Sequence, residues 1–114
     1  MAVILAVGNG ALANTTTGFE NTAIGAGALV DNTDGRFNTG VGRFALQHNT
    51  TGGFNVALGA NAGILANGYN NIYLGANVYG VANELGTIRL GNQDPIAAEQ
   101  SQKLYCWYQS GRPP

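Results

Sequence analysis

Asn21-Thr22-Ala23-Ile24-Gly25 is the first of four related segments that decide the fold. The others are Asn38-Thr-Gly-Val-Gly42, Asn55-Val-Ala-Leu-Gly59 and Asn71-Ile-Tyr-Leu-Gly75, and the closing glycines lie 17, 17 and 16 residues apart. The register extends back to Val7-Gly8 and forward to Leu90-Gly91. Because this period is too short for a pair of helices, it predicts an all-β fold, a parallel β-roll or β-solenoid of about six coils of 16–17 residues.

The repeated segment predicts one short strand per coil, with two different faces. Side chains alternate along a strand, so the aliphatic residue before each closing glycine shares a face with its copies in the other coils. We predict that these residues form the core ladder: Ile24, Val41, Leu58 and Leu74. The opposite face carries small residues, which indicate close approach by another subunit. The predicted subunit interface is therefore Ala23, Gly40 and Ala57, together with Ala28, Leu29, Ala45 and Leu46.

A second glycine keeps the same step and follows an Asn- and Thr-rich stretch in most coils. We predict that these residues, Gly18, Gly35, Gly52 and Gly68, are turn glycines with positive φ. A Gly-x-x-Ala-Leu segment lies between the strand and this turn, as in Gly25–Leu29 and Gly42–Leu46. It is predicted to form a second short strand, which gives two strands and two turns per coil.

Aromatic and threonine residues raise two alternative binding functions. Phe19, Phe37, Phe54 and Tyr69 cluster near the second glycine, where an aromatic row can form either a sugar-binding platform or an edge that packs. Packing is favoured, because these positions shift by one residue between coils. Thr runs at 15–17, 33 and 50–51 invite an ice-binding interpretation, but they fall in the predicted turns.

Composition excludes several classes of function. The 114 residues allow one domain, and the net charge of -1 offers no basic footprint for nucleic acid. One cysteine, Cys106, and one histidine, His48, give no disulfide framework and no metal-ligand spacing, so no metal and no cofactor are expected. No segment is long enough to span a membrane. The apolar start of the chain fits the first coil better than a signal peptide, because no basic residue precedes it.

Catalysis is not expected from this chain. Its six acidic residues are Glu20, Asp31, Asp34, Glu84, Asp94 and Glu99. The repeat places no two of them as a general acid and base, so a tailspike-like hydrolase is the weakest alternative.

A slender roll favours self-association. Its ratio of core to surface is poor, and its terminal coils present open strand edges. Charged residues make up only 10% of the chain, against a usual value of about 25%. We therefore expect the chain to associate with copies of itself.

Asn-Thr-Ala-Ile-Gly followed by Ala-Leu resembles the head repeat of trimeric autotransporter adhesins, the YadA-like head. The resemblance covers residues 6–92, and the repeats here are longer than those of the family. It implies a left-handed β-roll that trimerises. It also implies a cell-surface or extracellular location and a role in adhesion to host matrix or surface glycans, or in structural display.

The composition changes after Asn92. We therefore divide the chain into a β-roll domain, residues 1–92, and a C-terminal cap or tail, residues 93–114. Ile96–Lys103 has a helical pattern, and Leu104–Tyr108 is an apolar, aromatic cluster. A solenoid needs a cap on its last coil, so we expect this tail to cover the open end rather than to serve as a docking peptide.

Overall fold

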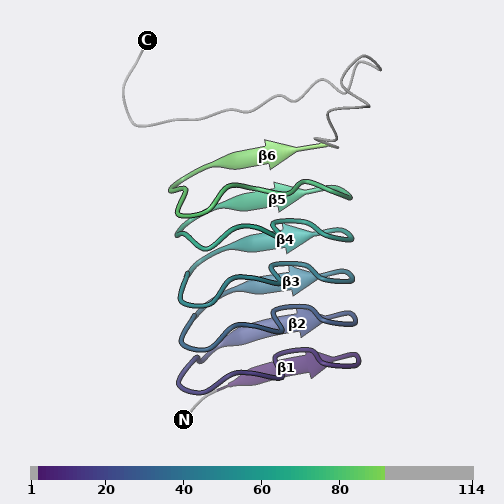
Figure 1. The fold of residues 1–114 in the computed structure, drawn as a ribbon, viewed down its shortest axis with the longest axis vertical. Coiled ribbons are helices and arrows are strands. Elements are labelled where there is room, and N and C mark those ends of the chain that lie inside the picture. Colours follow the sequence, from purple (N-terminus) through teal and green to yellow (C-terminus); the bar gives the residue numbers. More distant parts are fainter. Residues whose placement is uncertain (1–2, 92–114) are drawn as a thin grey trace.

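A computed structural model of the chain describes residues 3–91. It confirms the all-β solenoid. Six parallel strands form one sheet in chain order, and each complete turn of the chain adds one strand (Figure 1). The strands are β1 (Ile4–Val7), β2 (Asn21–Ile24), β3 (Thr39–Val41), β4 (Val56–Leu58), β5 (Ile72–Leu74) and β6 (Ile88–Leu90).

The sequence period is the register of this sheet. Ala23 pairs with Gly40, Gly40 with Ala57, and Ala57 with Tyr73. Residues that are equivalent in the repeat therefore lie directly above one another, about 4.8 Å apart. The closing glycines also bond to the preceding coil in register: the Gly42 N–H donates to the carbonyl of Ile24 at 2.7 Å.

The return path of each coil is a run of tight turns, so the predicted second strand is wrong. The N–H groups of Ala28, Val30 and Asn32 donate to the carbonyls of Gly25, Gly27 and Leu29 at 3.2, 3.3 and 3.0 Å. Gly27 and Leu29 have φ of 70° and 52°. A left-handed residue at every second position is incompatible with an extended strand. Hydrogen bonds between coils still hold this side together, as from Leu29 N–H to the Ala45 carbonyl at 2.9 Å.

The two faces of the sheet are the reverse of those predicted. Ala23 and Ala57 are fully buried, whereas Ile24 and Leu58 are 38% and 42% exposed. Val41 and Leu74 of the predicted core ladder are only half-buried. The reason is the narrow interior: a Cβ on Gly40 would lie 3.5 Å from Leu29 Cδ1, so only small inward strand residues fit beside the leucines of the turns.

The predicted subunit interface is therefore the interior of the roll. Gly40 is buried, and the other six residues are fully buried within their own chain: Ala23, Ala57, Ala28, Leu29, Ala45 and Leu46. Such residues cannot touch another subunit. Small residues indicate that other atoms approach the strand closely, but they do not indicate whether those atoms belong to the same chain or to another subunit.

The predicted turn glycines are required for lack of space and not for their φ. Gly18, Gly35, Gly52 and Gly68 are all buried and are absent from the residues with positive φ. A Cβ on Gly35 would collide with Oδ1 of Asn32 and with the Gly52 carbonyl. Positive φ belongs instead to the closing glycines, such as Gly25 at 129° and Gly42 at 131°.

A column of buried asparagines links successive coils: Asn21, Asn38, Asn55 and Asn71. The Asn38 Nδ2 donates to the Gly52 carbonyl at 2.8 Å, and its Oδ1 accepts the Asn55 N–H at 3.0 Å. The same pattern joins Asn55 to Asn71. Each amide thus satisfies backbone groups where the chain enters the strand, which explains why Asn opens the repeated segment.

Candidate interaction surface

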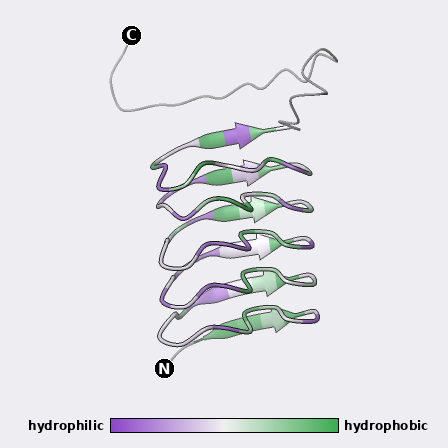
Figure 2. Cartoon of the chain, viewed as in Figure 1, coloured by the Kyte–Doolittle hydropathy of each residue, from purple (hydrophilic) through white to green (hydrophobic). Residues whose placement is uncertain are grey.

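The outward face of the sheet is a regular array of apolar side chains. One column holds Val7, Ile24, Val41, Leu58, Leu74 and Leu90, and the other holds Leu5, Thr22, Thr39, Val56, Ile72 and Ile88. Every strand shows hydrophobic residues in the hydropathy view (Figure 2). We call these twelve residues the sheet face. None of them is charged, although an exposed strand face usually carries polar side chains.

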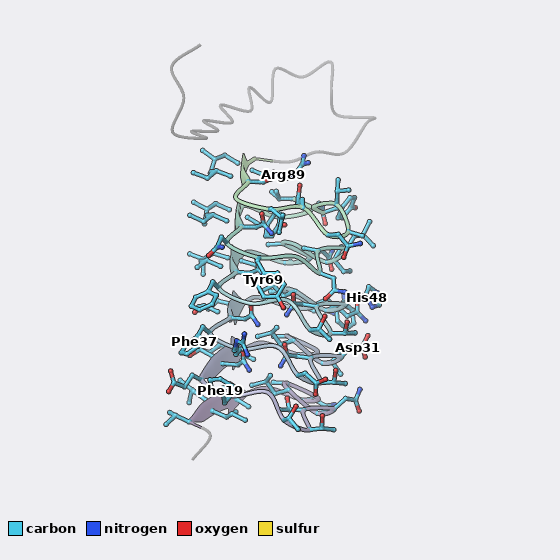
Figure 3. The ribbon with its side chains drawn as sticks, turned by 90° about the vertical axis from the view of Figure 1, so that its left-hand side faces the viewer. Phe19, Asp31, Phe37, His48, Tyr69 and Arg89 are labelled. Carbon is cyan, nitrogen blue, oxygen red and sulfur yellow. The ribbon has the colours of Figure 1, made fainter. Side chains whose placement is uncertain are left out.

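An aromatic column adjoins the sheet face at the start of the strands. It consists of Phe19, Phe37, Phe54 and Tyr69. Phe54 lies two residues before Val56, and a chain of parallel bridges continues the sheet through Phe19, Arg36, Gly53, Tyr69 and Leu85. Figure 3 places Phe19 and Phe37 on the strand side of the roll, opposite Asp31 and His48.

The rings of the aromatic column pack on one another. Phe37 and Phe54 are stacked with ring centroids 4.8 Å apart and planes inclined by 18°. Phe19 meets Phe37 edge to face at 5.3 Å, and the guanidinium of Arg36 lies over Phe19. Tyr69 donates its hydroxyl to the Thr51 carbonyl at 3.0 Å. Phe37 and Phe54 therefore each cover one face of the other ring.

The opposite corner of the roll is polar. Thr16 and Thr33 donate their hydroxyls to carbonyls of the next coil, at Thr33 and Thr50, both at 3.2 Å. Asp34 accepts from Thr17 and Thr16, and these hydrogen bonds lower the pKa of the Asp34 carboxyl. His48 Nδ1 lies 2.9 Å from Oδ2 of Asp31. Thr16, Thr17 and Thr33 thus bond to the backbone or to Asp34, and all three lie in turns and not on a strand.

A partly buried polar cluster lies at the fifth coil. Glu84 accepts from Tyr73 Oη at 2.7 Å, from Arg89 Nη2 at 2.9 Å and from the Val81 N–H at 2.9 Å. Burial raises the pKa of Glu84, but the hydrogen bonds from Arg89, Tyr73 and Val81 outweigh it and hold that pKa below its ordinary value. Burial first, and then Glu84, raise the pKa of Tyr73.

Sequence reasoning missed this cluster although a signal was present. Tyr73 and Arg89 continue the column of Ala23, Gly40 and Ala57, where a large and then a charged residue breaks the pattern. That column faces the interior, so Arg89 requires a buried partner, and Glu84 supplies it.

Metal and membrane sites receive no support from residues 3–91. In this range no three His, Cys, Asp or Glu side chains gather where they could hold a metal ion. The same residues contain no helix that could span a membrane. Cys106, Asp94, Glu99 and the predicted cap of residues 93–114 lie outside the described residues.

Comparisons with protein-family models, with curated proteins and with solved structures found no match for this chain. The fold defines its class as a parallel β-solenoid with one strand per coil. The candidate function therefore rests on the sheet face and the aromatic column.

Proposed function

We propose that this chain is a non-enzymatic structural module that works as a homotrimer, as a head-like unit for surface binding or display. The observation that carries the proposal is the uncharged sheet face, with Val7, Ile24 and Leu58 all more than a third exposed. A regular, uncharged array of exposed aliphatic side chains favours a role in interaction, since an exposed strand face usually carries polar side chains. The trimer is thus retained from the sequence analysis, but its contact moves to the side chains that face outward.

Sedimentation equilibrium of the full chain tests the assembly. The expected species has three times the 11.7 kDa mass of the chain. A single species at 11.7 kDa over the whole concentration range would overturn the trimer and, with it, the adhesin-like function.

The adhesive role is the second part of the proposal and has its own test. The resemblance to adhesin heads points to extracellular matrix or a surface glycan as the ligand, and to the cell surface as the location. Labelled protein applied to immobilised collagen, fibronectin and a panel of surface glycans would show saturable binding to at least one of them. Binding to none would reduce the proposal to structural display.

The carbohydrate-binding alternative is less well supported. A sugar platform needs exposed ring faces, and Phe37 and Phe54 turn theirs toward each other. The ice-binding alternative needs a threonine array on a flat strand face. The sheet face carries only Thr22 and Thr39 among ten aliphatic residues.

The hydrolase alternative is also less well supported, because the acidic side chains named here have structural partners. Glu84 is held by Arg89, Tyr73 and Val81, and Asp34 is held by two threonine hydroxyls. Asp31 pairs with His48. Carboxylates with these contacts serve the structure, which favours a non-enzymatic module.

A further inference from the structure

We propose that the sheet face and the aromatic column are the two complementary halves of one contact between copies of this chain. In this arrangement the sheet face of one copy packs against the aromatic column of the next. The inference rests on the proposed homotrimer and specifies which surfaces meet. It is built on the backbone of the aromatic column, on the size of the sheet face and on the geometry of a closed ring.

Two of the four residues of the aromatic column, Phe37 and Phe54, have a strained backbone, whereas Phe19 and Tyr69 do not have positive φ. Phe37 and Phe54 have φ of 57° and 58°, in the left-handed region that bulky residues rarely adopt. The same position holds Glu20 in the first coil, with φ of 53°, and Asn70 and Gly86 in later coils, where the residue suits this backbone. Leu29 and Leu46 also have positive φ, but both are fully buried and fill the core.

Phe37 and Phe54 have φ values similar to those of Leu29 and Leu46, but their side chains are much less buried. They are 37% and 49% exposed, so a large part of each ring faces solvent in the single chain. Strained backbone tends to persist where it serves a function. A second copy that covers the ring edges would supply the missing burial.

The sheet face has a small footprint for a contact between two copies. Six strands about 4.8 Å apart and three to four residues long span roughly 24 by 10 Å. Its flat footprint is about 250 Å² by these spacings, and a stable contact buries about 800 Å² of accessible surface on each partner, a measure that also counts the relief of the side chains. A contact that extends onto the aromatic column and onto Leu85, which is 65% exposed, would come nearer to that size.

A closed three-fold ring needs two different patches on each copy. One patch that meets its own equivalent gives a two-fold dimer, while a ring forms when one patch meets a second one on the neighbour. The sheet face and the aromatic column are two such patches, and they lie side by side over the first four coils. None of the twelve residues of the sheet face carries a charge, so that half of the contact would bury no unpaired ion. On the other half, Arg36 lies over Phe19, and Glu20 occupies the position equivalent to Phe37.

Two double variants separate the two patches. Ile24→Lys with Leu58→Lys places charges on the sheet face, and Phe37→Asn with Phe54→Asn removes two rings while keeping residues that tolerate positive φ. Ala26→Lys with Ala60→Lys is the matched control for the first variant, because both alanines are exposed two residues further along the same coils. Glu20→Asn, with φ of 53° at the position equivalent to Phe37, is the control for the second.

Native mass spectrometry and sedimentation of the full chain give the readout, with circular dichroism to confirm folding. We expect trimers for the wild type and for both controls, and monomers for each double variant alone. An equimolar mixture of the two variants should form a heterodimer. In that pair the intact sheet face of the aromatic variant meets the intact column of the sheet-face variant.

Each outcome has a distinct meaning. If the folded variants stay monomeric on mixing, the sheet face of one copy does not pack against the aromatic column of another, and the inference is wrong. A trimeric Phe37→Asn, Phe54→Asn variant would also overturn it, and would leave the trimer itself standing. A monomeric wild type would refute the proposed function instead.

Discussion

At the scale of single residues, the side-chain amides of the asparagine column link successive coils through hydrogen bonds to the backbone. Asn38 satisfies the Gly52 carbonyl and the Asn55 N–H, and both groups lie where water does not reach. Asn38→Ala should therefore lower the free energy of unfolding by about 2–4 kcal/mol, since a buried unpaired polar group costs about 1–3 kcal/mol. Urea unfolding measures this change.

Asn14→Ala is the matched control for Asn38→Ala. Asn14 is exposed and makes one long contact of 3.4 Å with Asp31. Its loss should change stability by no more than about 0.5 kcal/mol. Equal effects from the two substitutions would contradict the structural role of the column.

A position in this fold can require glycine for two different reasons, a lack of space for a Cβ or a positive φ. Gly35 has no positive φ but no room for a Cβ, whereas Gly10 has φ of 76° and nothing within 4 Å. Gly35→Ala should cost about 1–3 kcal/mol or more through overpacking, and Gly10→Ala about 1–2 kcal/mol through strain. Thermal unfolding of the two variants ranks them, and a more damaging Gly10→Ala would show that φ, not space, dominates.

At the scale of the element, adjacent residues of one strand should behave in opposite ways. Ala57 points into the core and Leu58 points outward. Ala57→Glu buries an unpaired charge and should abolish folding, while Leu58→Glu should keep the β-sheet signal in circular dichroism. Loss of folding in Leu58→Glu alone would restore the face assignment that the sequence analysis made.

The sequence predicts the two faces of each strand but not which of them points into the core. The period of 17, 17 and 16 residues predicts the strands and their register, because stacked coils require equivalent residues to align. Alternation within Asn21–Ile24 also predicts that two faces exist. It does not say which face is inside, since that depends on the interior width. Leu29 and Leu46 set that width from the turn side, where a left-handed leucine has no simple sequence signal.

The cluster at the fifth coil makes stability depend on pH. The folded-state pKa of Glu84 lies below its ordinary value, so its contribution is complete above that ordinary value. The contribution falls away as pH drops through the lowered folded-state pKa. In wild-type protein, urea midpoints should therefore decline across this acidic range, beyond the decline in Glu84→Gln.

The stabilities of the wild type and of Glu84→Gln should also differ at neutral pH. At neutral pH, Glu84→Gln should be the less stable of the two, because Arg89 loses its charged partner inside the roll. The two stabilities should converge in acid. Parallel curves at all pH values would mean that Glu84 does not act through its charge.

At the scale of the whole molecule, the roll is a one-dimensional stack in which each strand pairs only with its neighbours in sequence. Such a stack should tolerate the loss of one whole coil. Deletion of residues 26–42 joins Gly25 to Arg43, and Gly25 has nearly the φ of Gly42, which precedes Arg43 in the intact chain. The shortened chain should fold with the same circular dichroism spectrum and unfold at a lower urea concentration.

Deletion of residues 26–34 provides the contrast, because it removes about half a coil and shifts every later residue out of register with the coils before the deletion. Asn38 would then lose its contact with Asn21, and Gly40 would no longer lie above Ala23, whereas the pairs among the later coils stay in register. This variant should therefore be clearly less stable than the variant that lacks residues 26–42. If both deletions fold equally well, the stack does not depend on register, and the period that defines this sequence would have no structural role.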